Sequence, residues 1–186
     1  DERKWIERIL AGDTQSFSCL VAKYEKMAYT IALRILENRE EAEEAVQDAF
    51  VKMYRALSDF HFDSKFSTWF YRIVYRTALT ALRQQRMFVS YEEAGPVDLS
   101  NDEVESATAL LEREDRKEMI ARTLKKLPAD EALLLTLYYL EECSVEEICQ
   151  ITELSASNVK VKLFRGRKRF YEVLRDKMKL ETADLL

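Results

Sequence analysis

The stretch KFSTWFYRIVYRTALTALRQQR (65–86) combines cations with aromatic rings and contains no carboxylate. No Asp or Glu occurs between Asp63 and Glu92, although the chain has a net charge of −5. At about 100° per residue, Trp69 lies beside a single stripe formed by Arg72, Arg76, Arg83 and Arg86. Such a stripe favours a polyanionic partner, and exposed rings can stack on unpaired bases. This pattern predicts that the segment binds single-stranded DNA.

A second basic segment lies near the end of the chain. Residues 156–179 contain nine Lys or Arg against two acids. A short helix within SVEEICQIT and a tight turn precede this segment, and Ser144 with Glu147 matches a capping box. This is helix-turn-helix spacing, in which the start of the second helix enters the major groove and later basic residues hold phosphates. The predicted groove residues are Ser157, Asn158, Lys160 and Lys162, and the predicted phosphate contacts are Arg165, Arg167 and Arg169.

Composition predicts that these segments sit on long helices. Only three Gly and two Pro occur in 186 residues, which favours helices with short connections. A helix capped by Asp13 and a helix over about 40–57 precede the 65–86 segment. The second of these has an acidic ridge on the side opposite its apolar face, suited to a basic partner surface: Glu37, Glu40, Glu41, Glu44, Gln47 and Asp48.

The domain boundaries follow from charge. Residues 87–107 contain the only Gly-Pro pair and six acids without a base, whereas residues 1–86 carry a net charge of +1 and residues 108–186 are neutral. The chain is therefore predicted to be all-α, with two small helical domains (1–86 and 108–186) joined by an acidic flexible linker (87–107). The second domain contains the helix-turn-helix.

Several classes of function are disfavoured. One His, His61, and three Cys without CxxC spacing predict no metal site or cofactor, and the thiols are expected to be buried and reduced in a cytoplasmic protein. No apolar run reaches the roughly 20 residues of a membrane span. No phosphate loop or nucleophile–base pair indicates an enzyme. A dimeric helix-turn-helix regulator would explain residues 144–169 but not the rings of 65–86, and a helical scaffold would explain neither.

The chain resembles the extracytoplasmic-function (ECF) sigma factors, small two-domain sigma factors of bacterial RNA polymerase. The resemblance is carried by NREEAEEAVQDAFVKMYRAL (38–57), FDSKFSTWFYRIVYR (62–76) and SVEEICQITELSASNVKVKLFRGRKRF (144–170). Two departures are Thr152-Glu153-Leu154, which lacks the Gly often found in this turn, and Cys149 in place of Ala.

The resemblance implies a function and a set of contacts. The chain would bind core RNA polymerase, direct it to promoters of a stress or cell-envelope regulon and assist DNA melting. The first domain would bind the β′ clamp helices through Glu44, Gln47, Asp48 and Met53, with the β subunit as a further partner. The melted non-template strand of the minus-ten element would bind residues from the loop and the next helix: His61, Phe62, Asp63, Ser64, Lys65, Phe66, Trp69, Arg72, Tyr75, Arg76, Arg83 and Arg86. The basic helix would read the duplex minus-thirty-five element. An anti-sigma factor, in some cases membrane-anchored, would regulate the chain.

Overall fold

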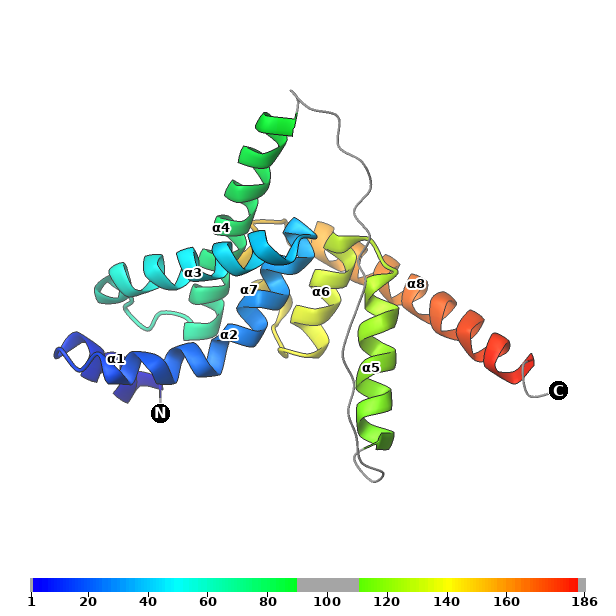
Figure 1. The fold of residues 1–186 in the computed structure, drawn as a ribbon, viewed down its shortest axis with the longest axis horizontal. Helices are drawn as coiled ribbons and strands as arrows, with labels where there is room; N and C mark the ends of the chain where they lie inside the picture. The colour runs from blue at the N-terminus through cyan, green and yellow to red at the C-terminus, as the bar shows by residue number, and fades with distance from the viewer. Residues whose placement is uncertain (1, 90–110, 184–186) are drawn as a thin grey trace.

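The computed structural model describes residues 2–89 and 111–183, with side chains within 2–85 and 118–176. All regular elements in these ranges are helices (Figure 1). The first half holds α1 (Glu2–Leu10), α2 (Gln15–Leu36), α3 (Arg39–Arg55), the 3-10 helix η1 (Leu57–Asp59) and α4 (Phe66–Val89). The second half holds α5 (Leu111–Lys125), α6 (Ala129–Tyr139), α7 (Val145–Thr152) and α8 (Ala156–Ala183). The prediction of two all-α domains is confirmed. Most of the predicted linker, 87–107, lies outside the described residues.

The first domain is built on α2, α3 and α4, which pack against one another in pairs. Apolar residues recur on one face of each helix, and burying them in a common core removes apolar surface from water. In α4, Phe70, Val74 and Ala78 are fully buried, as their spacing predicts. Asn38 caps α3 by accepting a hydrogen bond from the Glu41 N–H at 3.1 Å. Burial of the apolar face of α3 fixes the direction in which its acidic ridge faces.

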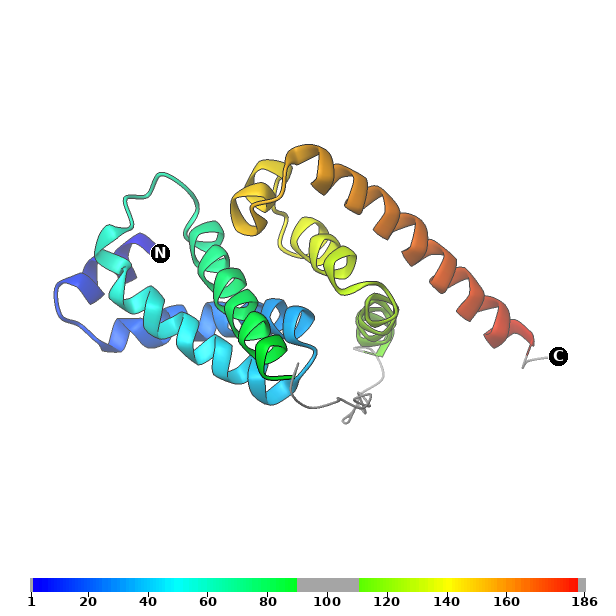
Figure 2. The ribbon, with the colours of Figure 1, turned by 90° about the horizontal axis from the view of Figure 1, so that it is seen from above.

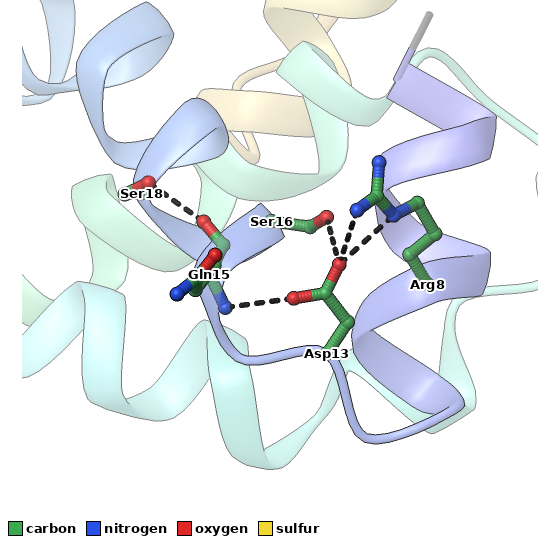
Figure 3. Close-up of polar contacts among 5 residues, drawn as sticks. All are labelled: Arg8, Asp13, Gln15, Ser16 and Ser18. Atoms are coloured by element: carbon green, nitrogen blue, oxygen red, sulfur yellow. Dashed lines mark hydrogen bonds and ion pairs between the residues drawn. The ribbon is translucent and has the colours of Figure 1, made fainter.

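Helix α1, which the sequence patterns did not predict, is held to α2 by the carboxylate of Asp13 (Figure 3). Asp13 binds the Arg8 guanidinium at 2.6 Å and accepts hydrogen bonds from the Gln15 N–H at 3.0 Å and the Ser16 hydroxyl at 2.9 Å. These contacts hold the pKa of Asp13 below its usual value, chiefly through the Ser16 hydrogen bond. The sequence predicts Asp13 as the N-cap of α2, but the N-cap position is Thr14. Asp13 caps the helix from one residue earlier.

The second domain packs α5, α7 and α8 around α6, which is buried along residues 131–137. Gly166 in α8 faces α6 so closely that a Cβ there would lie 3.2 Å from Leu135 Cδ1 and 3.3 Å from Glu131 Cβ. The predicted packing face of α8 is confirmed, since Val159 and Leu163 are buried and Phe170 is partly buried. The close contact holds α8 against α6 at its third turn.

The two domains contact each other, an arrangement that the sequence did not predict. Helix α7 packs along α4, and α6 packs against α2. Figure 2 shows α1–α4 on one side and α5–α8 on the other, with α7 next to the beginning of α4. Because α4 carries the predicted single-strand contacts, this packing bears directly on the candidate site.

The three thiols are free, as predicted, but only Cys143 is buried. Cys149 is partly buried and Cys19 is exposed, so the expectation of buried thiols is wrong for Cys19. Cys19 precedes Leu20 on the helix, and a rotation of about 100° between neighbours takes it off the buried face. Burial raises the pKa of Cys143 to about 11. Within the described residues no group of His, Cys, Asp and Glu is arranged to hold a metal ion.

Candidate nucleic-acid and polymerase interfaces

A cluster of aromatic rings lies where η1 leads into α4. The Phe60 ring centroid lies 5.4 Å from that of Phe66, 5.0 Å from that of Trp69 and 4.7 Å from that of Phe62. Phe60 and Phe66 are buried, whereas Phe62 is 39% exposed and Trp69 is partly exposed. Phe62 adopts a positive φ of 60°, which is unusual for a bulky residue. The inner rings of the cluster are therefore buried, and an unpaired nucleobase could stack on its exposed edge.

Phe62 also contacts α1. The Arg3 guanidinium carbon lies 4.7 Å from the centroid of the Phe62 ring, a cation–π arrangement. Sequence reasoning missed Arg3, because nothing in the sequence pattern places the first turn of the chain beside residue 62. Its position adds a cation to the edge of the aromatic cluster.

The remaining predicted minus-ten residues follow the loop and α4. His61 and Asp63 are exposed, and Ser64 is partly buried, with its hydroxyl donating to the Lys65 carbonyl at 3.4 Å. Arg76 and Arg83 are exposed, and Arg72 and Tyr75 are partly buried. The side chain of Arg86 lies outside the described residues. Phe66 has only 3% exposure, so it supports the cluster from the core and presents no surface to DNA in this conformation.

Two of the predicted DNA-binding cations are already paired with acids of the second domain. Lys65 Nζ lies 2.9 Å from Glu147 Oε1, and Arg76 Nε donates to Glu153 Oε1 at 3.0 Å. The hydrogen bond to Glu147 raises the pKa of Lys65, and the hydrogen bond from Arg76 lowers the pKa of Glu153. Burial opposes the shift of Glu147, but bonds from Ser144 and Lys65 leave its pKa below the usual value.

A hydrogen bond from a neutral hydroxyl to a third carboxylate lies between these two pairs. The Tyr71 hydroxyl donates to Glu141 Oε2 at 2.7 Å. Burial raises the pKa of this hydroxyl above its usual value, and the Glu141 bond adds to the effect. The side of α4 that faces α7 is therefore occupied by carboxylates along its first three turns.

The predicted polymerase-binding ridge lies on the outer side of α3. Glu44, Gln47 and Asp48 are exposed, whereas Met53 has no exposed surface. Met53 must therefore be removed from the predicted contact set for this conformation, because its side chain packs into the core. A groove of about 430 Å³ runs between α3 and α4, lined on the α3 side by Glu41, Glu44 and Asp48. Glu41 accepts a hydrogen bond from Gln85 at 3.0 Å, which fixes one wall.

The helix-turn-helix is formed as predicted. Ser144 accepts from the Glu147 N–H at 3.1 Å, and its own N–H donates to the Glu147 carboxylate at 2.8 Å, which completes the capping box. Glu153 ends α7 in the left-handed conformation with φ 62°, so a residue other than Gly accepts the turn geometry, as expected from the sequence. Ser155 then accepts from the Asn158 N–H at 3.4 Å at the start of α8.

The basic residues of α8 differ in their availability. Ser157, Asn158, Lys160, Arg165, Arg167 and Arg169 are exposed. Lys162 is partly buried and bound to Asp130, and Arg169 Nε lies 3.6 Å from the buried Glu131 carboxylate. Arg167 Nη1 donates to the Tyr139 hydroxyl at 3.4 Å. Lys162 and Arg169 therefore fix α8 to α6 in this conformation.

Two apolar residues that sequence reasoning passed over lie on the exposed side of α8. Val161 is 46% exposed and Phe164 is 65% exposed. Phe164 follows Lys160 by four residues and precedes Lys168 by four, so the three share one helical face. Sequence reasoning could have found Phe164 from this spacing. Apolar side chains at such positions can contact the methyl group of thymine in the major groove.

Both domains match known protein families. Residues 20–87 match the Sigma-70 region 2 family, and residues 117–170 match Sigma-70 region 4. The RNA polymerase sigma-H factor of Pseudomonas aeruginosa is 31% identical over 93% of each chain. The ECF RNA polymerase sigma-E factor of Escherichia coli is 31% identical over 88% of each chain.

Solved structures show the same fold. The sigma factor RpoE of Bartonella quintana, solved with the anti-sigma factor NepR, matches with a TM-score of 0.70 and 18% identity over 87% of this chain and 98% of that one. CnrH, solved with the cytosolic domain of CnrY, matches with a TM-score of 0.61 and 21% identity over 94% and 97%.

Both domains are thus those of a sigma-70 type transcription factor, which binds RNA polymerase and promoter DNA. The chain belongs to the ECF sigma factors, as the sequence resemblance predicts. It directs RNA polymerase to promoters. Within residues 2–89 and 111–183, no helix has the length and apolarity that crossing a bilayer requires.

Proposed function

We propose that this sigma factor captures the melted non-template strand of the minus-ten element on α4 and reads the minus-thirty-five duplex with α8. This proposal is supported by the exposed side of α4, which carries the exposed Arg76 and Arg83 and the partly exposed Trp69 and contains no carboxylate. The exposed Phe62 lies in the loop before this helix. Arginines would track phosphates while the rings receive unstacked bases. A base flipped from the duplex costs a few kcal/mol, which stacking offsets.

On α8, the exposed residues divide into two roles. Ser157, Asn158 and Lys160 at the start of the helix would contact base edges, with Phe164 against a thymine methyl group. Arg165 and Arg167 would hold phosphates and fix the register. On α3, Glu44, Gln47 and Asp48 would meet the basic side of the β′ clamp helices, where complementary charge favours association.

The proposed regulation is by an anti-sigma factor in the cytoplasm. RpoE was solved with the anti-sigma factor NepR, and CnrH was solved with the cytosolic domain of CnrY. This chain shares the fold of both. The regulated promoters would belong to a stress or cell-envelope response, and the anti-sigma factor would be membrane-anchored. Affinity purification followed by identification of the co-purified chains would test both polymerase and an anti-sigma factor as partners. The β and β′ subunits should be recovered with the sigma factor.

Run-off transcription tests the role of α4. A promoter is first selected from genomic fragments with the unchanged protein and core polymerase, and Trp69→Ala is then assayed on it. Loss of one stacking contact, worth about 1 to 3 kcal/mol, should reduce open-complex formation about 5- to 150-fold, and a pre-melted template should restore most of the activity. Arg83→Ala should also reduce it, whereas Arg122→Ala, an exposed arginine on α5, should not. Normal initiation by Trp69→Ala and Arg83→Ala would refute the role of α4.

A further inference from the structure

The first helix of the chain lies beside the aromatic cluster, although it is outside both residue ranges that match a family. Residues 20–87 match Sigma-70 region 2, and α1 (Glu2–Leu10) precedes them. Helix α1 packs against η1 as well as α2, and its Arg3 lies over the ring of Phe62. The site proposed for the minus-ten strand therefore borders a part of the chain that the family match does not cover.

Helix α1 is firmly attached to the first domain. The face of α1 that points toward the core carries two buried isoleucines. In its first turn, the Glu2 carboxylate accepts hydrogen bonds from Lys23 and Tyr24 of α2. At its other end, the contacts of Asp13 join α1 to the start of α2 (Figure 3). Because both ends of α1 are attached to α2, Arg3 is held at a fixed place beside the loop that contains Phe62.

The Arg3 guanidinium covers Phe62 while most of its hydrogen-bond donors stay open. Its carbon lies 4.7 Å from the ring centroid, so the contact uses the face of the guanidinium. The five N–H donors lie around the edge of that plane. Among the described residues the ion-pair partner of Arg3 is Glu7, with Nε 3.4 Å from Oε1 and side chains 71% and 63% exposed. Such an exposed pair is weak, so a stronger anion can take the place of Glu7.

The position of Arg3 suits the phosphate of a stacked nucleotide. Phe62 is 39% exposed, and within the described part of the chain Arg3 is the cation that lies over a ring of this cluster. Base and phosphate belong to one nucleotide, so a base that stacks on the exposed edge of the cluster carries its phosphate to the rim. Arginine binds a phosphate through two parallel N–H groups, which is the part of Arg3 that the ring contact leaves open.

We propose that Arg3 of α1 binds a phosphate of the melted minus-ten strand while the base of that nucleotide stacks on the exposed edge formed by Phe62 and Trp69. This inference rests on the proposed function of α4 and extends the single-strand site to a helix outside the region 2 match. When the phosphate binds, Arg3 gives up its pair with Glu7. Helix α1 then acts as a part of the DNA-binding surface.

Holoenzyme assembled from core polymerase and the full-length chain tests the role of Arg3. The probe is a fluorescent oligonucleotide with the non-template strand of the minus-ten element of the selected promoter. Anisotropy gives its dissociation constant between about 0.05 and 0.2 M salt. Arg3→Ala removes the proposed contact, and Arg3→Lys keeps the charge. The matched control Lys4→Ala removes an equal charge from the same turn of α1, at an exposed position about 100° further around the helix.

Arg3→Ala should weaken binding of the probe about fivefold at about 0.05 M salt, the upper end for an exposed ion pair. Loss of one phosphate contact to a single strand should also lower the slope of log K against log[salt] by about 0.7, so the loss should shrink to about twofold at about 0.2 M salt. Arg3→Lys should keep the slope of the unchanged protein. Lys4→Ala should keep both its slope and its affinity.

Several results would overturn the role of Arg3: normal binding by Arg3→Ala, an equal loss in Lys4→Ala, or a loss that does not change with salt. Weaker binding of Arg3→Ala to core polymerase without DNA would assign the side chain to polymerase and overturn it too. Trp69→Ala separates this inference from the proposed function. If Trp69→Ala weakens binding and Arg3→Ala does not, only the role of Arg3 is refuted, whereas normal binding by Trp69→Ala would refute the proposed function of α4.

Discussion

Gly166 offers a direct test of how α8 is fixed in the second domain. Its backbone faces α6, where an added Cβ would lie 3.2 Å from Leu135 Cδ1, 3.3 Å from Leu135 Cγ and 3.3 Å from Glu131 Cβ. Leu135 and Glu131 are both buried, so neither can move freely away. A Cβ belongs to the rigid part of a side chain, and Glu131 can yield only if α6 itself shifts. Larger residues at 166 should therefore push α8 off α6.

The magnitude depends on two opposing effects. Replacing a helical Gly by Ala stabilises the helix by about 1 kcal/mol, whereas overpacking a core costs about 1 to 3 kcal/mol. Gly166→Ala should consequently lower the free energy of unfolding of the second domain by about 1 kcal/mol. Gly166→Leu adds three more carbons in the same direction and should lower it by about 2 kcal/mol or more. Lys168→Ala, at an exposed position of the same helix, should change it little.

The two domains can be followed separately during unfolding. The only tryptophans of the chain are Trp5 and Trp69, both in the first domain. Urea unfolding followed by circular dichroism reports helices of both domains, and tryptophan fluorescence reports the first. For Gly166→Leu the circular dichroism transition should begin at lower urea while the fluorescence transition moves less. A Gly166→Leu protein that unfolds like the unchanged chain in both signals would refute the close packing of α8 on α6.

Two further predictions concern single side chains. Ser144→Ala removes the acceptor for the Glu147 N–H and should lower the free energy of unfolding of the second domain by about 1 kcal/mol. Urea unfolding measures this loss, with Ser58→Ala as an exposed control. An unchanged free energy of unfolding would show that the capping box is not stabilising. Because burial raises the pKa of Cys143 to about 11, its thiol is almost entirely protonated at pH 8. Mass spectrometry should therefore find the exposed Cys19 alkylated by iodoacetamide well before Cys143. Faster labelling of Cys143 would contradict its burial.

Much of the fold could be predicted because helical periodicity is a local property. The spacing of Val159, Leu163, Gly166 and Phe170 identified the packed face of α8, and the Ser144–Glu147 pair identified the start of α7. The turn at Glu153 was also predicted, since no Gly was available to take the left-handed conformation. In each case the deciding interaction lies within a few residues along the chain.

The contacts and the burial that the sequence did not predict share a different origin. Met53 and Phe66 carry side chains that could contact a partner, but their burial depends on the three-dimensional packing of the first domain. Arg3 reaches Phe62 across 59 positions of sequence, and Lys162 reaches Asp130 across 32. Periodicity cannot predict such pairs, because it describes which face of one helix is apolar and not which residue of another element lies opposite.

The polar contacts between the two domains are individually weak. Exposed ion pairs such as Arg76–Glu153 are worth about 0.2 to 1 kcal/mol each, and the pair of Lys65 with the partly buried Glu147 is also open to solvent on the lysine side. Arg76 and Glu153 are 77 positions apart in the sequence, so helical periodicity could not predict this pair either.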